Sequence, residues 1–536
     1  MSDFKSEHSS LPFKETGYFS NLICDYLDQK ESLKPLYQNF SDLNGYKNQM
    51  ALKKEVFTAE SRSVLVASLN LQYKKVEASE LSLNNIQSLL NDNTFTVTTG
   101  HQLNLFTGPL YFLYKIVTVI NLSKSLKKAF PENNFVPIYW MATEDHDFEE
   151  INYFNFKNQK VKWERSFGGG VGRLSTEGLN DVFEAFSKNL GESQFADELK
   201  SLFKKAYLEH DNLADATFYL ANQLFSAYGL VILDADKSEL KSLFSDTIKD
   251  ELLNQTCFNA VSKSAEALSN LNYKVQVNPR PINLFYLKEN LRERIVFEQN
   301  SYKVLNTSLV FTKDQILDEV DRYPERFSPN VLTRPLYQET ILPNLSYTGG
   351  GGELAYWFEM NAYFEQRNVP FPILLLRNSV LAISEKQAQK ITKLNLKAKD
   401  LFLNQDALLS KVIKEISDIS IDFSEQKNNL QNMFSDLKQL ALRTDKSFIG
   451  AVNAQEHKQL KGMTVLEKRL LKAQKRKYVD ITERIKILQN ELFPNQSLQE
   501  RYLNFSELYL LYGSQLIPHL IKNLEPLTLE FSILRF

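Results

Sequence analysis

Six ionisable side chains stand within seven residues at 144–150, EDHDFEE. They follow the apolar run 135–142, which is expected to be a strand. Carboxylates and an imidazole so placed suit acid–base catalysis, amine binding or magnesium coordination, whereas zinc is disfavoured because no second histidine stands at helix spacing. The alternative is a solvated acidic loop that caps a helix. Because the cluster lies at an expected strand end, we favour a catalytic role for Asp145, His146 and Asp147.

A glycine-bounded segment, residues 99–109 (TGHQLNLFTGP), leads from a short β-branched run into a long apolar helix candidate. The free N–H groups at a helix N-terminus attract anions, and Gly100 and Gly108 allow close backbone approach. The segment has neither the Gly-Lys-Ser/Thr ending of a P-loop nor the dinucleotide pattern G-x-G-x-x-G. A ligand-binding loop and a structural turn both remain open. The candidate ligand-binding residues here are Gly100, His101, Gln102, Thr107 and Gly108.

Two later segments also combine polar residues with backbone features that suit ligand binding. Residues 328–335, SPNVLTRP, contain Asn330 and Arg334, and an arginine can hold a carboxylate or phosphate in a bidentate fork. A structural ion pair is the alternative for Arg334. Residues 349–357, GGGGELAYW, place four glycines before a helix start. A mobile linker is the alternative, but we favour a ligand cradle with Gly351, Glu353 and Tyr356.

The elements that position these residues are predicted to form a parallel sheet. Short apolar runs, which suit strands buried on both faces, occur at 95–99, 135–142, 230–233 and 373–376. A helix is expected over 110–130, and strand–helix–strand order builds a parallel α/β sheet. Ligands bind outside the carboxyl ends of such strands. Polar residues gather there, including Arg377 after the fourth run.

Changes in the residue pattern along the chain predict four regions. Residues 1–92 are helical and 93–384 form the α/β core, with insertions at about 151–228 and 271–350. Residues 151–173 resemble a hairpin. Residues 385–494 are expected to form an antiparallel coiled-coil arm, and 495–536 to return as helices to the core.

The arm is predicted from apolar residues at alternating spacings of four and three, as from Leu430 to Phe448 and from Met463 to Leu492. We expect its turn near 453–462. So thin an arm commonly pairs with another chain, which predicts a homodimer.

Bulk composition excludes some classes of protein. The 536 residues carry a net charge of −2, which gives no global field for nucleic acid or anionic membranes. The two cysteines, Cys24 and Cys257, have no partner at metal-ligand or redox spacing. There is no apolar signal core near the start and no stretch of 18 apolar residues. A soluble cytoplasmic protein without nucleic-acid or membrane partners is expected.

Four of these segments together resemble the cysteine-adding enzyme family of bacillithiol biosynthesis. The resemblance rests on TGHQLNLFTGPLYFLYK (99–115), WMATEDHDFEEIN (140–152), SPNVLTRP (328–335) and GGGGELAYW (349–357) in this order, and it extends to the opening segment and the helical tail. It implies a Rossmann-like core with inserted connecting segments and a long C-terminal α-helical coiled coil used for dimerisation. It also implies a ligase that joins L-cysteine to glucosaminyl malate in the last step of the pathway.

The implied amide formation needs an activated carboxyl group, so ATP or another nucleotide is expected, with Mg²⁺ as a possible companion. Thr107–Leu110 and Lys115 would then face phosphate. Asp145, His146 and Asp147 would orient the amines or accept a proton. The remaining candidate substrate-binding residues are Asn330, Arg334, Gly351, Glu353, Tyr356 and Arg377, with Arg334 on the malyl carboxylates.

Two other function classes remain open from the sequence. One is a nucleotidyl-transfer enzyme that acts on a different small carboxylate. The other is a dimeric coiled-coil scaffold without catalysis.

Overall fold

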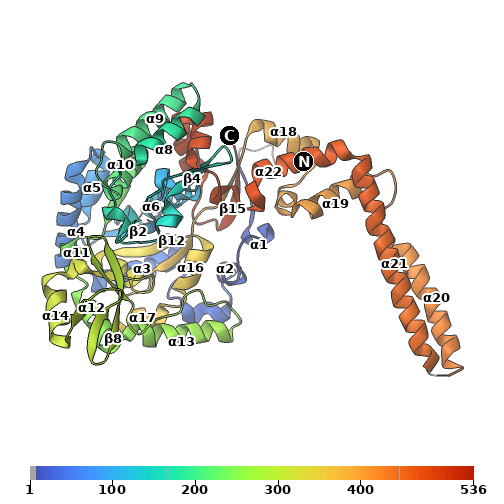
Figure 1. Ribbon diagram of the computed structural model, residues 1–536, viewed down its shortest axis with the longest axis horizontal. Coiled ribbons are helices and arrows are strands. Elements are labelled where there is room, and N and C mark those ends of the chain that lie inside the picture. Colours follow the sequence, from blue (N-terminus) through green and yellow to red (C-terminus); the bar gives the residue numbers. More distant parts are fainter. Residues whose placement is uncertain (1–7, 166, 446) are drawn as a thin grey trace. The chain divides into compact units, whose positions relative to one another are not determined.

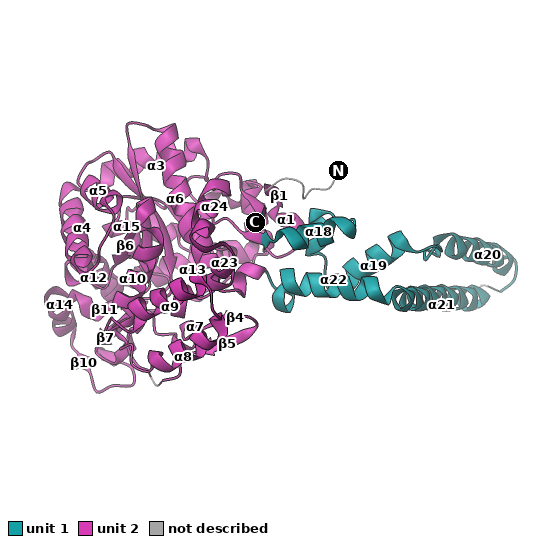
Figure 2. Ribbon diagram, turned by 90° about the horizontal axis from the view of Figure 1, so that it is seen from above, with its two compact units in different colours: residues 1–7, 382–498, 535 teal, residues 8–381, 499–534, 536 magenta. Residues whose placement is uncertain are grey.

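The computed structural model describes residues 8–165, 167–445 and 447–536. Contacts within the chain divide it into a larger unit (residues 8–381, 499–534 and 536) and a smaller unit (382–498 and 535), drawn in two colours in Figure 2. Among the described residues, no helix is long and apolar enough to cross a membrane.

A five-stranded parallel sheet lies in the larger unit (Figure 1) and confirms the predicted Rossmann-like core. Its strand order is β13-β12-β2-β3-β6. Four strands coincide with the predicted apolar runs, and the fifth, β12, was not predicted. The strands are β2 (Thr94–His101), β3 (Asn134–Met141), β6 (Val231–Asp234), β12 (Asn344–Gly349) and β13 (Ile373–Leu376).

The chain order of these strands creates a topological switch point. From β2 the chain adds β3 and then β6 on one side, and later returns to add β12 and β13 on the other side. Neighbouring connections that leave in opposite directions open a crevice at the carboxyl ends of the strands where they part. Here that crevice lies between Gly100 at the end of β2 and Gly349 at the end of β12.

Three threonines of β2 are hydrogen-bonded across the central pair of strands. The Thr96 and Thr98 hydroxyl groups donate to Asn344 Oδ1 over 3.2 and 2.8 Å, and Thr99 Oγ1 donates to the Thr348 carbonyl over 2.8 Å. Every residue of β2 is buried. Buried polar groups must be hydrogen-bonded, so these threonines favour β12 as the neighbour of β2.

Helices surround this sheet. The helix α6 (Tyr111–Ala129) connects β2 to β3, as predicted. The other helices of the larger unit are α1 (Phe13–Thr16), α2 (Asn21–Leu27), α3 (Leu43–Val56), α4 (Ala59–Gln72), α5 (Glu80–Ser88), α7 (Phe148–Ile151), α8 (Leu179–Leu190), α9 (Gln194–Tyr207), α10 (Leu213–Phe225), α11 (Ser238–Ser242), α12 (Ser245–Asn254), α13 (Thr256–Asn270), α14 (Lys313–Arg322), α15 (Arg334–Ile341), α16 (Gly351–Trp357), α17 (Asn361–Gln366), α23 (Phe505–Tyr512) and α24 (Leu516–Asn523).

Two antiparallel additions interrupt the parallel core. The expected hairpin after the acidic cluster is present as β4 (Tyr153–Phe156) and β5 (Gln159–Lys162). A five-stranded sheet of order β10-β9-β8-β7-β11 lies within the later insertion. Its strands are β7 (Leu284–Lys288), β8 (Leu291–Glu298), β9 (Ser301–Val304), β10 (Val310–Phe311) and β11 (Phe327–Pro329).

The end of the chain is not helical throughout, which corrects one prediction. After α24 the chain forms the strand β15 (Glu530–Arg535), which pairs antiparallel with β1 (His8–Pro12) in a sheet completed by β14 (Val380–Ile383). The middle of β15 is buried on both faces and places Phe531, Ile533 and Leu534 in the core. The prediction failed because pairing with β1, more than 500 residues earlier, has no local signal.

The smaller unit contains α18 (Glu385–Lys393), α19 (Gln405–Ile416), α20 (Ser424–Leu442), α21 (Ser447–Lys477) and α22 (Val479–Leu492). The helices α20 and α21 pair around Phe434, Ala441 and Val452. The predicted turn at 453–462 is wrong, since these residues lie inside α21, and the chain reverses between Leu442 and Ser447. Asp445 stabilises that reversal by accepting the Ser447 N–H over 2.9 Å.

A buried carboxyl group beyond α16 predicts a pH-dependent stability. Glu359 is fully buried, and burial raises its pKa from 4.5 to about 7 against hydrogen bonds from the N–H groups of Gln276 and Val277. The folded state therefore binds more protons than the unfolded chain between these pH values. The free energy of unfolding falls as the pH rises through this window, by up to about 3 kcal/mol.

We expect Glu359→Gln to flatten this dependence, so that the variant gains stability over the wild type at pH 8 but not at pH 4. Thermal unfolding at both pH values measures the difference. Equal pH dependence of the two proteins would contradict the assignment.

Candidate active site

A cavity of about 450 Å³ opens at the carboxyl ends of β2, β3, β12 and β13, at the topological switch point. Most of the predicted site residues line it: Gly100, His101, Gln102, Lys115, Asp145, Asn330, Arg334, Glu353, Tyr356 and Arg377. Thr107, Gly108, His146, Asp147 and Gly351 are not among its lining residues. The structure thus brings residues from all four sequence clusters together at one cavity.

A buried ion pair joins α6 to α16 at the cavity. Lys115 Nζ lies 2.7 Å from Glu353 Oε2 and also donates to the Gly100 carbonyl over 2.6 Å. Glu353 accepts further hydrogen bonds from the Tyr347 hydroxyl and the Gly350 N–H. Burial alone would raise the pKa of Glu353, but Lys115 and these donors lower it overall. Glu353 is therefore an anionic partner for Lys115.

Close backbone approach explains the glycine at the end of β2. A Cβ atom on Gly100 would lie 2.9 Å from the Tyr347 hydroxyl oxygen, which donates to Glu353. The neighbouring His101 is buried against the rings of Tyr111 and Phe112. Burial, followed by the nearby Lys115 charge, lowers the pKa of His101 well below 6.5. Its imidazole is therefore neutral at physiological pH.

Arg334, the first residue of α15, lies among aromatic rings. Its guanidinium carbon is 5.3 Å from the Tyr347 ring centre and 5.7 Å from that of Trp140. Nη1 donates to Gln338 Oε1 over 3.0 Å, while the buried Nη2 has no hydrogen-bond partner among the described residues. No carboxylate of the described chain forms an ion pair with it. The nearby Glu353 carboxylate acts on Arg334 but pairs directly with Lys115, so this desolvated guanidinium favours a further anionic ligand such as a carboxylate.

Arg377, after β13, is held by a buried carboxylate. Its Nη1 and Nη2 atoms lie 3.0 and 2.7 Å from the two oxygens of Glu500, and both side chains are almost completely buried. The buried Nε has no partner among the described residues. The bidentate fork is therefore used within the protein.

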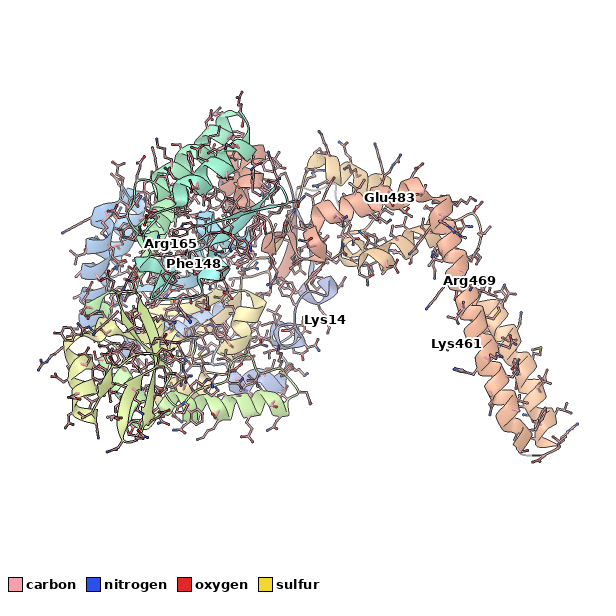
Figure 3. The ribbon with its side chains drawn as sticks, viewed as in Figure 1. Lys14, Phe148, Arg165, Lys461, Arg469 and Glu483 are labelled. Atoms are coloured by element: carbon pink, nitrogen blue, oxygen red, sulfur yellow. The ribbon has the colours of Figure 1, made fainter. Side chains whose placement is uncertain are left out.

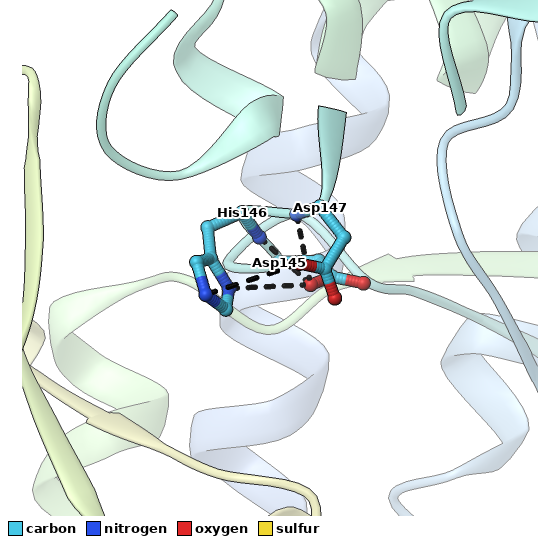
Figure 4. Close-up of side chains that lie close together, drawn as sticks. All are labelled: Asp145, His146 and Asp147. Carbon is cyan, nitrogen blue, oxygen red and sulfur yellow. Dashed lines mark hydrogen bonds and ion pairs between the residues drawn. The ribbon is translucent and has the colours of Figure 1, made fainter. Parts of the chain in front are cut away.

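The acidic cluster forms a tight turn after β3 (Figure 4). Asp145 Oδ1 accepts the N–H of His146 over 2.7 Å, and Oδ2 accepts the Gln102 side chain over 2.8 Å. Burial tends to raise the pKa of Asp145, but the His146 side chain, followed by these two hydrogen bonds, lowers it to about 2. His146 and Asp147 are more exposed than Asp145, with 45 and 54 % of their side chains accessible. The side-chain atoms with which these three residues could bind a metal ion lie within 4.8 Å of one another.

Other parts of the chain already form hydrogen bonds with the backbone groups at the start of α6. Phe106, Thr107 and Gly108 have positive φ angles, and Asn504 Nδ2 holds the Phe106 and Gly108 carbonyl groups over 2.8 and 2.7 Å. The Leu110 N–H donates to the Leu503 carbonyl over 2.6 Å. Gly351 packs near Phe19 and Ile23 on α2 and its preceding loop. Thr107, Gly108 and Gly351 therefore contribute to the packing of the loop before α6 and of the start of α16.

Sequence reasoning missed several lining residues: Trp140, Glu144, Arg292, Tyr347 and Arg501. Glu144 stood in the acidic cluster and could have been included. Arg292 is the second residue of β8 in the inserted sheet, where no motif marks it. Asn330, which was predicted, caps the chain before α15, because its Oδ1 accepts the N–H groups of Leu332 and Thr333.

Comparisons with known proteins cover the whole chain. Residues 7–378 match the family model "Bacillithiol biosynthesis BshC, N-terminal Rossmann-like domain", and residues 380–536 match "Bacillithiol biosynthesis BshC, C-terminal coiled-coil domain".

Three similar proteins all carry the name "Putative cysteine ligase BshC". A protein of Flavobacterium johnsoniae is 56% identical over 524 residues, which cover 98% of this chain and 99% of that protein. One of Christiangramia forsetii is 53% identical over 530 residues, 98% of each chain. One of Bacillus thuringiensis is 27% identical over 518 residues, 94% of this chain and 95% of that protein.

Proposed function

Because this chain belongs to the BshC family, the cysteine ligases of bacillithiol biosynthesis, we propose that it joins L-cysteine to the glucosamine amine of glucosaminyl malate in the cytoplasm. The cavity at the carboxyl ends of the parallel strands is the proposed active site. The observation that carries this assignment is the Arg334 guanidinium, which lines the cavity without a carboxylate partner while the Asp145 carboxylate lines it as well. Both substrates carry carboxylates and amines, and such a pair of opposite charges suits them.

The charge states suggest different roles for the two ends of this cavity. Arg334 would hold a carboxylate of the malyl group through Nη2, with Arg377 Nε as a second donor. Asp145, with a pKa of about 2, remains ionised at neutral pH and is a very weak base. It would therefore orient an ammonium group rather than accept the proton that leaves the attacking amine.

Amide formation by a ligase needs an activated carboxyl group, which a nucleotide, with or without Mg²⁺, supplies when bound. The segment Thr107–Leu110 does not fit a phosphate group. Its Leu110 N–H donates to Leu503, and the carbonyls beside Thr107 are held by Asn504. Lys115 is already paired with Glu353. The activating nucleotide would therefore need other partners on this chain.

The proposal includes a homodimer formed through α20 and α21. Leu440 and Leu466 on these helices are 56 and 52 % exposed, and charged side chains such as Lys461 and Arg469 accompany them on α21 (Figure 3). Burying such apolar side chains against a second copy stabilises a dimer, as in coiled coils.

We expect the wild-type protein to elute as a dimer in size-exclusion chromatography with light scattering, and the double variant Leu440→Glu, Leu466→Glu to elute as a monomer. Leu511→Glu is the matched control, because Leu511 is 63 % exposed in the larger unit. A wild-type monomer at tens of micromolar concentration would exclude this dimer.

The function is tested by thiol profiling with mass spectrometry in cells with and without the gene. Loss of bacillithiol together with accumulation of glucosaminyl malate is the expected result. An unchanged thiol pool calls for expression of the gene in a strain that lacks the cysteine-adding step. Failure to restore bacillithiol there would reject the proposed function.

A further inference from the structure

Arg292 links the inserted antiparallel sheet to the acidic turn of the cavity. It is the second residue of β8, and its guanidinium stacks over the Phe285 ring with 4.0 Å between the guanidinium carbon and the ring centre. Nε donates to Ser328 Oγ over 3.2 Å, and Nη1 lies 2.8 Å from Nδ1 of His146. These contacts fix the direction in which Nη1 points.

The contact between Arg292 and His146 determines where the imidazole carries its proton. A guanidinium group has five N–H donors and no acceptor, so Nδ1 of His146 must accept this hydrogen bond. A neutral imidazole that accepts at Nδ1 carries its proton on Nε2. A protonated Nδ1 would instead set two donors against each other at 2.8 Å.

Asp145 also faces Nδ1, but its contact with this atom is longer than that of Arg292. Asp145 Oδ1 lies 3.7 Å from this atom, beyond hydrogen-bond distance, and already accepts the His146 N–H over 2.7 Å. Asp147 Oδ1 lies on the side of Nε2, at 3.9 Å. Because the shorter contact is the one with Arg292, it decides the tautomer.

We propose that Arg292 is a positioning residue of the ligase: it holds His146 as the Nε2–H tautomer, so that His146 donates a hydrogen bond from Nε2 to an oxygen atom of the acceptor substrate. Half of the His146 side chain is exposed beside lining residues Asp145 and Arg292, so it reaches the part of a ligand that extends beyond the cavity. The inference rests on the proposed function for the substrate, but the tautomer can be measured without it.

The first experiment reads the tautomer directly. In full-length protein with ¹⁵N-labelled histidine, long-range ¹H–¹⁵N correlation spectra distinguish protonated from unprotonated ring nitrogens, and His146→Asn identifies the His146 signals. We expect a protonated Nε2 and an unprotonated Nδ1 in the wild type. Arg292→Gln should release this preference, whereas Arg294→Gln, on the same strand, should not. A protonated Nδ1 in the wild type, or an unchanged tautomer in Arg292→Gln, overturns the proposal.

The second experiment tests whether Arg292 acts through His146. Arg292→Gln should raise KM for the acceptor about tenfold, the size of one lost hydrogen bond, and leave KM for cysteine unchanged. Arg292→Lys, which keeps a donor, should recover part of the loss. Arg292→Gln should add nothing in the His146→Asn background, and an additive effect would refute the mechanism. If the enzyme uses another acceptor, the proposed function fails while the spectra still decide the tautomer.

Discussion

Replacing Arg334 by methionine is expected to lower kcat/KM of the ligase reaction by about a hundredfold or more, which corresponds to two charge-assisted hydrogen bonds at about 1.5 kcal/mol each. Methionine keeps much of the apolar stem between Tyr347 and Trp140 but removes every N–H donor. Arg334→Lys keeps the charge without the planar fork, so we expect it to recover only part of the activity. The measurement is formation of the cysteine adduct by mass spectrometry at varied acceptor concentration.

Arg326 provides the matched control for this prediction. Its guanidinium also stacks on an aromatic ring, that of Tyr323 at 3.7 Å, but it pairs with Glu319 and does not line the cavity. Arg326→Met removes only a surface ion pair, so it should leave kcat/KM unchanged within about twofold. Wild-type activity in Arg334→Met, with folding intact, would remove Arg334 from the active site.

Continuous apolar runs made two strands predictable from the sequence. β3 and β13 are buried on both faces, and their unbroken apolar residues mark them without any tertiary information. β12 alternates Asn344, Ser346 and Thr348 with apolar residues, which is the pattern of a half-exposed strand or a loop, yet all of its residues are buried. Asn344 is tolerated there because β2 offers it threonine hydroxyl groups. Such pairing is a tertiary property that no local window contains.

The residues of the candidate site also fall into those that a local sequence pattern marks and those that only tertiary contacts place. Asp145 and Arg377 could be predicted because they directly follow predicted strands, and the carboxyl ends of parallel strands meet at one edge. Arg292 could not, because it comes from the inserted sheet and reaches the cavity only through the register of β7 and β8. The turn of the arm was misplaced for a related reason: apolar spacing continues from Leu442 into α21, so the pattern does not mark the point of reversal.

The second large effect is expected from Glu500, which sequence reasoning did not single out. It is fully buried and binds the guanidinium of Arg377 through both oxygens, and Oε2 also accepts the Val380 N–H over 3.1 Å. Glu500→Gln leaves a buried guanidinium without a counter-charge. Breaking one partner of a buried ion pair costs about 3–5 kcal/mol, because the remaining charge stays desolvated. For a unit of this size we expect the melting temperature to fall by roughly 5 °C.

Two further variants separate stability from ligand binding at this pair. Glu31→Gln breaks the exposed ion pair with Lys34 and should leave the free energy of unfolding almost unchanged. The double variant Arg377→Met, Glu500→Leu removes both charges and should recover most of the stability that Glu500→Gln loses, since apolar side chains can replace a buried pair. If Arg377 Nε also binds substrate, this double variant will fold but lack ligase activity. A double variant with wild-type activity would show that Arg377 does not bind substrate.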